Sequence, residues 1–233
     1  MSGADSPPRA ATPRVSAPRV IAIDGPAAAG KGTLARRLAA HFGYAYLDTG
    51  LLYRAVGFKV LQAGADPADP AAAVKAAQAL VPGELGNPEL RTDDAANAAS
   101  KVAAIPEVRR ELVNFQRDFA AKPPGSAKGA VIDGRDIGTV VCPRADVKFF
   151  VTASLEARAE RRLKELRDRG VAGIHSRVLR DMQDRDTRDS QRDTAPLRMA
   201  DDAILLDTTE LDADETFAAA LKSIESRERT GSV

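Results

Sequence analysis

The chain has 233 residues, 44% of them hydrophobic and only 4% aromatic, which supplies enough small aliphatic side chains for one core. Its 34 lysine and arginine residues nearly balance its 33 aspartate and glutamate residues, so the net charge of +1 excludes a global field that would attract nucleic acid or a membrane. A single cysteine, Cys142, excludes an internal disulfide; with only two histidines it argues against a zinc site and indicates a reducing compartment, the cytoplasm.

Residues 1–18 predict a disordered extension because they combine repeated prolines with arginine, serine and alanine. They lack the apolar core of a secretory signal. Their shortage of acidic residues leaves an organelle-targeting peptide as the alternative, which the prolines disfavour because they break an amphipathic helix. Since no apolar run in the sequence approaches the length of a membrane span, we expect no membrane partner.

From residue 20 onwards, apolar and β-rich runs alternate with helical patterns. This alternation predicts an α/β fold in which a parallel sheet is covered by helices. The runs that predict its five strands are VIAID at 20–24, YAYLD at 44–48, AVID at 130–133, VKFFVT at 147–152 and AILLDT at 203–208.

Helices are predicted between these strands by apolar periodicity and by residues that start or stop a helix. The first covers 31–42 and ends before a glycine, and two others cover 50–62 and 155–169. A further helix opens at Asp212, which with Glu215 resembles a capping box.

Two stretches depart from this alternation. Between 64 and 124 the strand pattern lapses, and Pro70, Thr92 and Pro106 each open an alanine-rich stretch that favours a helix, so we expect an all-helical insert. The stretch 170–196 is rich in charges of both signs and poor in apolar residues, which predicts a mobile lid. The expected organisation is one domain, 19–233, with its core at 19–63, 125–169 and 197–230, the insert at 64–124 and the lid at 170–196.

The stretch from Gly25 to Lys31 matches the phosphate-binding P-loop pattern and lies between a predicted buried strand and a predicted helix. Its glycines let backbone N–H groups turn toward phosphates, the helix adds its dipole, and Lys31 supplies a positive charge. The alternative is a glycine-rich turn beside an ordinary surface lysine, which this context disfavours. The residues expected around the nucleotide phosphates are Gly25, Pro26, Ala27, Ala28, Ala29, Gly30, Lys31, Gly32 and Thr33.

The P-loop departs from the general pattern at Gly32, because a hydroxyl residue usually follows the lysine. Here the hydroxyl comes one residue later, at Thr33. Because Mg²⁺ loses its water reluctantly, we expect it to be held through phosphates and water, with Thr33 as the one candidate for a direct protein ligand.

Further candidate residues follow a predicted strand. The strand at 130–133 ends in Asp133 and turns directly into Gly134, Arg135 and Asp136, at the edge of the sheet where α/β folds bind ligands. On its own this sequence favours a simple turn with a local Arg–Asp ion pair. The P-loop, together with the family resemblance described below, reverses that preference, and we expect a substrate at this turn.

The expected lid carries a regular pattern of arginines. Arg185, Arg188, Asp189 and Arg192 have the spacing i, i+3, i+4 and i+7, so in a helix they share one face. An exposed helix with i,i+4 ion pairs is the alternative. With a P-loop in the chain, we favour guanidinium groups that neutralise the charge of a transferring phosphoryl group.

Five motifs in order give a specific resemblance. GKGT in the P-loop, DTGLLYR at 48–54, NAASKVA at 97–103, DGRDIGTVV at 133–141 and RDTRDSQR at 185–192 resemble those of the bacterial cytidylate kinase family, among the nucleoside monophosphate kinases. The resemblance spans Val20 to the last helix. It implies a three-layer P-loop NTPase fold with a five-stranded parallel sheet, a helical nucleotide-binding insert and an arginine-rich lid. It also implies a monomeric, cytoplasmic, Mg²⁺-dependent enzyme of pyrimidine nucleotide metabolism. This enzyme would transfer the γ-phosphoryl group of ATP to CMP or dCMP, giving CDP or dCDP and ADP.

The resemblance implies roles for the residues at matching positions. The catalytic group would be Lys31, Arg135, Arg188 and Arg192, with Arg188 reaching the transferring phosphates. Arg54, Arg135 and Arg192 would hold the phosphate of the acceptor. Thr49, Arg185 and Asp189 would contact its sugar. Ser100, Arg109 and Asp136 would contact its base. The whole expected CMP site is Asp48, Thr49, Arg54, Ser100, Arg109, Asp133, Arg135, Asp136, Arg185, Asp189 and Arg192.

The sequence departs from the family at 64–91, where many members carry a β-hairpin and this chain shows no alternating strand pattern. We expect the hairpin to be missing, which bears on the preference between CMP and dCMP. The alternatives are the same chemistry on UMP, AMP or a small alcohol, a regulatory ATP-binding module without transfer, and an RNA-binding protein. The near-neutral charge and few aromatic residues argue against RNA, and the retained Lys31 argues against an inactive module.

Overall fold

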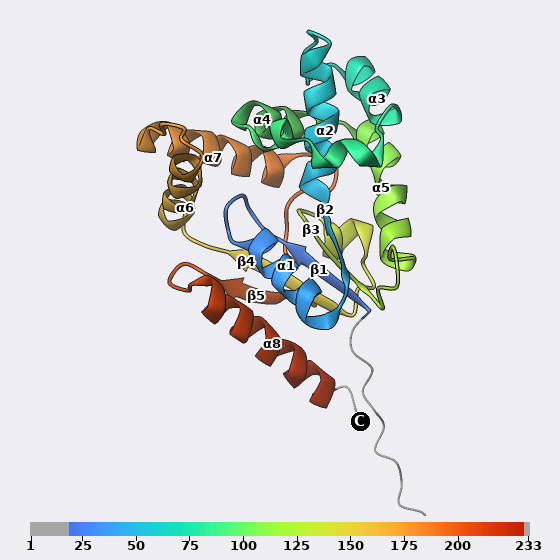
Figure 1. Ribbon diagram of the computed structural model, residues 1–233, viewed down its shortest axis with the longest axis vertical. Helices are drawn as coiled ribbons and strands as arrows, with labels where there is room; N and C mark the ends of the chain where they lie inside the picture. The colour runs from blue at the N-terminus through green and yellow to red at the C-terminus, as the bar shows by residue number, and fades with distance from the viewer. Residues whose placement is uncertain (1–18, 231–233) are drawn as a thin grey trace, which may run out of the picture.

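The computed structural model describes residues 19–230, so the extension expected at 1–18 lies outside the described residues. Within the described range the chain forms a five-stranded parallel sheet in the order β2-β3-β1-β4-β5 (Figure 1). The strands are β1 (Val20–Asp24), β2 (Ala45–Asp48), β3 (Ala130–Gly134), β4 (Val147–Thr152) and β5 (Ile204–Asp207). The expected α/β fold and its five strands are confirmed.

Helices cover both faces of the sheet and give three layers (Figure 1). One face is covered by α1 (Lys31–Phe42) and α8 (Ala213–Thr230), and the other by α5 (Pro106–Ala121) and a single π-helical turn, η3 (Ile137–Val141). Alternate residues of β1 serve the two layers, since Ile21 and Ile23 pack toward α1 while Ala22 packs toward η3. β1 is therefore apolar along its length because it is covered on both faces.

The helix boundaries follow the signals in the sequence. Helix α1 ends at Gly43, whose φ of 65° is left-handed and whose N–H bonds to the carbonyls of Ala39 and Ala40. Before α8, Asp212 Oδ1 accepts from the Glu215 N–H at 2.8 Å, and Glu215 Oε2 accepts from the Asp212 N–H at 2.9 Å. The expected glycine stop and capping box are confirmed.

Residues 64–124, all of them described, contain helices and no strand, so the all-helical character and the missing hairpin are confirmed. The elements are α3 (Pro70–Gln78), two short 3₁₀ turns η1 (Pro82–Gly86) and η2 (Pro88–Arg91), α4 (Asp93–Val102) and α5. With α2 (Thr49–Gln62) they bury a core of their own, which includes Leu52, Val102 and Leu112. This separate core holds the segment above the sheet as a unit.

Helices α2 and α4 cross in close contact at Gly57. A Cβ atom at this position would lie 2.7 Å from the Cβ of Ala98 and 2.9 Å from the backbone nitrogen of Ala99. No larger residue fits there without moving α4. The glycine therefore fixes the position of α4, whose last turn carries Ser100.

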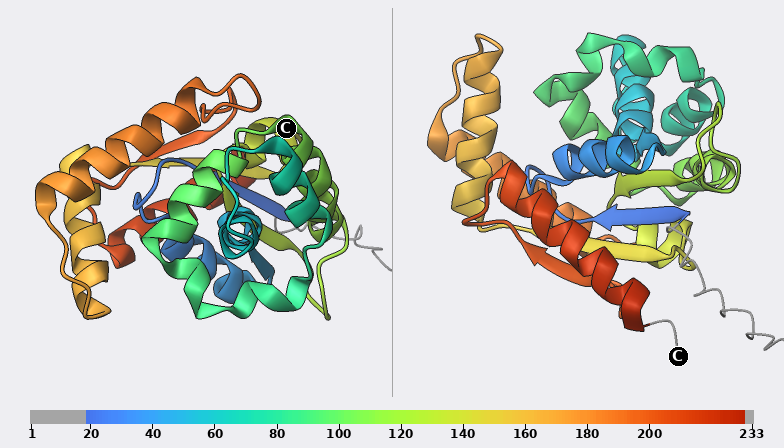
Figure 2. Two further views of the ribbon diagram at one scale, coloured as in Figure 1. Left: turned by 90° about the horizontal axis from the view of Figure 1, so that it is seen from above. Right: turned by 60° about the horizontal axis from the view of Figure 1, so that its bottom comes forward.

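Two further helices, α6 (Leu155–Asp168) and α7 (His175–Gln191), pack together through Leu166, Val178 and Met182. Figure 2 shows this pair standing beside the helical segment. Helix α7 ends before Arg192, whose backbone is extended with ψ at 141°. The expectation that Arg192 continues one helical face is therefore wrong, since the helix stops one residue earlier. Among the helices of residues 19–230, none is both long and apolar enough to cross a membrane.

Candidate active site

A pocket of about 320 Å³ opens beyond the carboxyl ends of β2 and β3, the edge where parallel sheets bind ligands. The predicted site residues that line it are Ala27, Ala28, Lys31, Gly32, Asp48, Thr49, Arg54, Ser100, Arg109, Asp133, Arg135, Asp136, Arg185, Asp189 and Arg192. The predicted residues outside its lining are Gly25, Pro26, Ala29, Gly30, Thr33 and Arg188. The structure thus brings together residues from segments that are far apart in the chain.

The P-loop has the tight backbone that its glycines allow. Gly25 has φ at 144°, and a Cβ there would lie 1.9 Å from the carbonyl oxygen of Val151, so only glycine fits. Lys31 is buried, and its Nζ donates a 2.6 Å hydrogen bond to the carbonyl oxygen of Pro26. Burial, with the nearby charge of Arg135, holds the pKa of Lys31 well below its usual value. A bound anion beside Lys31 would stabilise the protonated, positively charged form of its side chain, so the site is suited to an anion.

Asp133 lies at the end of β3 beside the P-loop. Its Oδ1 accepts a 3.3 Å hydrogen bond from the hydroxyl of Tyr46. Burial, with the neighbouring carboxylate of Asp48, raises the pKa of Asp133. A Cβ atom at Gly32 would lie 3.6 Å from Oδ2 of Asp133, so this carboxylate borders the space left by the missing P-loop hydroxyl. Two carboxylates beside one lysine make a place suited to a cation.

A buried ion pair forms the deep end of the pocket. Arg109 Nη2 donates to Asp136 Oδ2, and the two side chains are 8% and 5% exposed. Arg109 also donates to the carbonyl oxygen of Ala103 at 3.2 Å, and its guanidinium lies over the ring of Tyr53, 5.5 Å from the centroid. These contacts fix both groups of the pair in one orientation.

Arg192 adds a second guanidinium beside Asp136. Its Nη2 is 3.8 Å from Asp136 Oδ1, which is close enough for charge attraction but too far for a hydrogen bond, so this buried nitrogen has no hydrogen-bond partner. Arg185 Nε and Arg188 Nη1 are buried without a partner as well. Unmatched buried donors are costly, so Arg185 and Arg192, which line the pocket, are suited to an anionic ligand.

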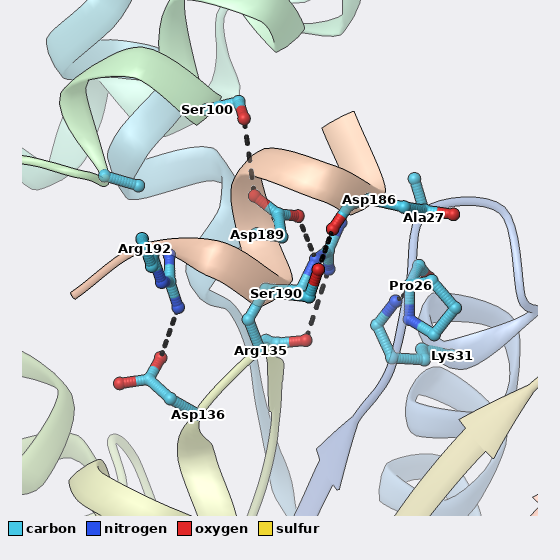
Figure 3. A network of polar contacts seen from close by, with 12 residues as sticks. Pro26, Ala27, Lys31, Ser100, Arg135, Asp136, Asp186, Asp189, Ser190 and Arg192 are labelled. Carbon is cyan, nitrogen blue, oxygen red and sulfur yellow. Dashed lines mark hydrogen bonds and ion pairs between the residues drawn. The ribbon is translucent and has the colours of Figure 1, made fainter. Parts of the chain in front are cut away.

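Asp189 joins three elements around the pocket (Figure 3). Its Oδ2 accepts from Arg135 Nε at 2.9 Å, and its Oδ1 accepts from Ser100 Oγ at 3.3 Å. Burial by itself would raise the pKa of Asp189, but the charge and hydrogen bond of Arg135 outweigh burial and hold it below the usual value. For Arg185, burial and the charges of Arg135 and Arg54 lower the pKa to about 10.

The rim of the pocket carries charged residues that the sequence analysis missed. Arg162 on α6 forms ion pairs with Glu165 and with Asp93 at the start of α4, and Arg169 donates a 2.8 Å hydrogen bond to the carbonyl oxygen of Arg91. These contacts join α6 to the helical segment. Their only sequence signal is a charge-rich helix, which is also typical of a solvent-exposed surface.

Arg158 was also missed. It is buried on α6, donates to the carbonyl oxygens of Ala153 at 3.0 Å and of Ala27 in the P-loop at 3.4 Å, and forms a 2.7 Å ion pair with Asp186 on α7. It therefore connects the P-loop to α7.

A parallel sheet, a P-loop after its first strand and a pocket lined with arginines define a P-loop phosphotransferase.

Comparison with known proteins gives the particular family. The sequence profile of the family described as cytidylate kinase matches residues 21–226, and the chain belongs to this family. The chain is 65% identical over 208 residues to the cytidylate kinase of Paramagnetospirillum magneticum, covering 89% of this chain and 98% of that protein. It is 61% identical over 202 residues to the cytidylate kinase of Rhodospirillum rubrum, covering 87% and 95%.

A solved structure of an uncharacterised protein from Eubacterium ventriosum aligns with a TM-score of 0.53 and 16% identity, covering 89% of this chain and 98% of that one, and supports the fold alone. The resemblance seen in the motifs is confirmed by the family match. The chain is accordingly an enzyme, a nucleoside monophosphate kinase that carries out ATP-dependent phosphoryl transfer.

Proposed function

We propose that the pocket binds CMP or dCMP beside ATP and transfers the γ-phosphoryl group to the acceptor, giving CDP or dCDP and ADP. The observation that carries this is the buried pair of Arg109 and Asp136, with Ser100 lining the same pocket. Cytosine offers an amino donor at N4 beside acceptors at N3 and O2, which a carboxylate or hydroxyl and a guanidinium can match. Uracil places an acceptor at that donor position and leaves buried groups unpaired.

Three arginines are expected to bind the phosphate of the acceptor. Arg54, Arg135 and Arg192 line the pocket from three different segments, and the free Nη2 of Arg192 supports an anion there. Arg185 and Asp189 would hold the sugar with Thr49. The acceptor oxygen belongs to a phosphate that is already anionic near neutral pH, so no general base is needed.

Transfer requires both substrates to lie in line with water excluded. Lys31 would hold the γ-phosphoryl group, and Arg188 on α7 would reach it after a change in position, since Arg188 does not line the pocket. We propose that 64–124 acts as the acceptor-binding insert and 170–196 as a lid of one domain, 19–233. The contacts of α4 and α6, and of α4 and α7, support this closure.

The residues present fit a Mg²⁺ ion held mainly by phosphates and water. Among residues 19–230 no cluster of three or more aspartate, glutamate, histidine or cysteine side chains could hold a metal. Asp133 and Asp48 supply hard oxygen atoms beside Lys31, whereas Thr33 is exposed and accepts a 3.4 Å hydrogen bond from Arg36. Asp133 and Asp48 would hold the ion through its water, and the ion would neutralise charge on the phosphates.

The test is ADP formation from ATP and Mg²⁺ with CMP, dCMP, UMP, AMP and no acceptor, measured in parallel. We expect activity with CMP and dCMP that exceeds activity with UMP and AMP by about a hundredfold or more. Equal activity with UMP would overturn the proposed base pocket while leaving the phosphotransferase class intact. Lys31→Ala should abolish transfer with every acceptor.

The proposal also covers the oligomeric state, the location and the partners of the protein. We expect a monomer that acts in the cytoplasm on small molecules and does not bind nucleic acid, in line with the single cysteine and the net charge of +1. Sedimentation of the purified protein measures the first, and a gel-shift titration with RNA measures the last. A shifted band at micromolar protein would contradict it.

A further inference from the structure

Asp24, the last residue of β1, is a buried carboxylate to which the proposed mechanism gives no task. It is 4% exposed and does not line the pocket. Its Oδ1 accepts the backbone N–H of Ile137 at 2.7 Å, and its Oδ2 accepts the backbone N–H of Gly138 at 2.7 Å. Both oxygens are thus committed to one short segment more than a hundred residues away in the chain.

That segment is the start of the π-helical turn η3, directly after Asp136. The carbonyl oxygen of Asp136 accepts from the N–H groups of Val140 at 2.9 Å and Val141 at 3.1 Å, which closes the turn. The first N–H groups of a helical turn have no partner within it. Asp24 supplies that partner for two of them, so it fixes the direction in which the turn leaves Asp136.

The fit around this contact is tight. A Cβ atom at Gly138 would lie 3.3 Å from Asp24 Oδ2 and 3.1 Å from Cδ of Lys148 on β4. Ile137 is fully buried. The turn therefore has little room to shift while Asp24 holds it.

The sheet register places the two ends of this contact side by side. Asp24 pairs with Gly134 in the parallel ladder between β1 and β3, and Gly25 of the P-loop follows Asp24 at once. One carboxylate therefore connects the base of the P-loop to the turn that carries Arg135 and Asp136. Burial raises the pKa of Asp24 to about 6 against its two backbone hydrogen bonds, so near neutral pH it is the ionised acceptor of both.

We propose that Asp24 is a positioning residue for base selection, which holds the turn at 136–138 so that the carboxylate of Asp136 faces Arg109. The inference rests on the proposed base pocket, since it adds a residue that does not touch the substrate. Without the two hydrogen bonds the turn can rotate, and Asp136 no longer meets Arg109 in the orientation that matches cytosine.

The test is Asp24→Asn, which keeps the shape of the side chain but can accept only one of the two hydrogen bonds. We expect the ratio of kcat/KM for CMP to that for UMP to fall about tenfold, with KM for CMP rising and KM for ATP within twofold of the wild type. Calorimetry of CMP binding to the variant should show the same loss of affinity without turnover.

The matched control is Asp146→Asn, because Asp146, which directly precedes β4, binds the opposite end of β1. Asp146 Oδ2 accepts the backbone N–H groups of Arg19 at 2.9 Å and Val20 at 2.8 Å, far from the pocket lining. This variant should lower stability and leave the CMP to UMP ratio unchanged. A second test variant, Gly138→Ala, crowds Asp24 from the other side and should lower the ratio even if Asp24→Asn folds poorly.

The outcomes distinguish the proposed base pocket from the role of Asp24. If the wild type does not distinguish CMP from UMP, the proposed base pocket is wrong. If the wild type distinguishes them and Asp24→Asn and Gly138→Ala do so equally well, the inference about Asp24 is wrong and the pocket stands. Equal losses for ATP and CMP in Asp24→Asn would assign Asp24 a general structural role and overturn base positioning.

Discussion

Ser100 Oγ on α4 donates a hydrogen bond to Asp189 Oδ1 on α7, 3.3 Å away, so that the helical segment and α7 meet across the pocket. Asp189 accepts from Arg135 Nε with its other oxygen, at 2.9 Å. The strand β3, the helix α4 and the helix α7 therefore share one carboxylate. The arrangement of the three elements around the pocket therefore depends on a few polar groups.

Asp189→Asn is expected to lower the free energy of unfolding by about 1–3 kcal/mol, because Arg135 loses its charged partner in a largely buried place. Ser100→Ala should cost about 0.5–1.5 kcal/mol. Ser190→Ala is the control, since its hydroxyl bonds only to carbonyls of its own helix and the residue is exposed. Urea unfolding of the three variants measures these differences, and an effect of Ser190→Ala as large as that of Asp189→Asn would contradict the expectation.

Arg109→Met leaves the carboxylate of Asp136 buried, with Arg192 as the remaining cation nearby. We expect a loss of about 2–4 kcal/mol in the free energy of unfolding, because a buried ion pair has lost one partner. Adding Asp136→Leu removes the unpaired charge and should recover most of that stability. Both proteins should lose the preference for CMP over UMP, measured as kcat/KM. Equal free energies of unfolding for the single and double variants would show that the unpaired carboxylate of Asp136 does not destabilise the protein.

Gly57→Ala should destabilise the protein by about 1–3 kcal/mol, although alanine is the better helix former. The reason is the crossing with α4, where the new Cβ would meet Ala98 at 2.7 Å. Gly86→Ala is the control, because a Cβ there has no neighbour within 4 Å. Thermal unfolding compares the two variants. KM for CMP should also rise in Gly57→Ala, since α4 carries Ser100, and an unchanged KM would contradict that link.

The pH dependence of stability should show the burial of Asp24. Its pKa is raised by burial from 3.8 to about 6 in the folded protein, so the folded state favours the protonated form more than the unfolded state does. The stability it contributes is present below about pH 4 and is lost as the pH rises through 6, a change of about 3 kcal/mol. Charged Lys31 opposes this shift and Asp136 adds to it.

Urea unfolding of the wild type and Asp24→Asn between pH 3.5 and 7.5 measures this dependence. The difference between them should be most favourable to the wild type at the acid end and decline toward neutral pH. For Asp189 the sign is opposite. Its pKa is held low by Arg135, so its contribution is present above the unfolded value of 3.8 and is lost as the pH falls. Asp189→Asn, unfolded over the same pH range, tests this second expectation. A difference from the wild type that does not depend on pH in either variant would contradict these assignments.

The sheet and most helix boundaries could be predicted from the sequence because their causes are local. Three examples are the apolar run that forms β1, the left-handed glycine after α1 and the reciprocal bonds of Asp212 and Glu215, each of which involves only residues close together in the chain. Such signals do not depend on the rest of the fold. The insert was recognisable for the same reason, since its helix starts at Pro70 and Pro106 are read from neighbouring residues.

The geometry of the pocket could be predicted only in part. Spacing placed Arg185 and Asp189 on one face of α7, but it could not show that the helix ends before Arg192 or that Arg188 lies outside the pocket lining. The contacts of Arg162 with Asp93 and of Asp24 with Gly138 join segments distant in sequence. Nothing local distinguishes these charged residues from others that face solvent. Their roles become visible only when the packing of helices against the sheet is known.

The rim contacts between α6 and the helical segment have a consequence for how the ionic medium governs turnover. Arg162 and Asp93 form an ion pair at the border of the pocket, where Asp93 is 53% exposed and dissolved ions reach it. We expect electrolyte to weaken this ion pair and so to speed the departure of products, while the same ions screen the arginine-lined pocket and slow the capture of nucleotides. Turnover measured against salt concentration should therefore pass through an optimum, falling in dilute salt because the ion pair opens slowly and in concentrated salt because nucleotides arrive slowly. A rate that only falls with added salt would contradict this expectation.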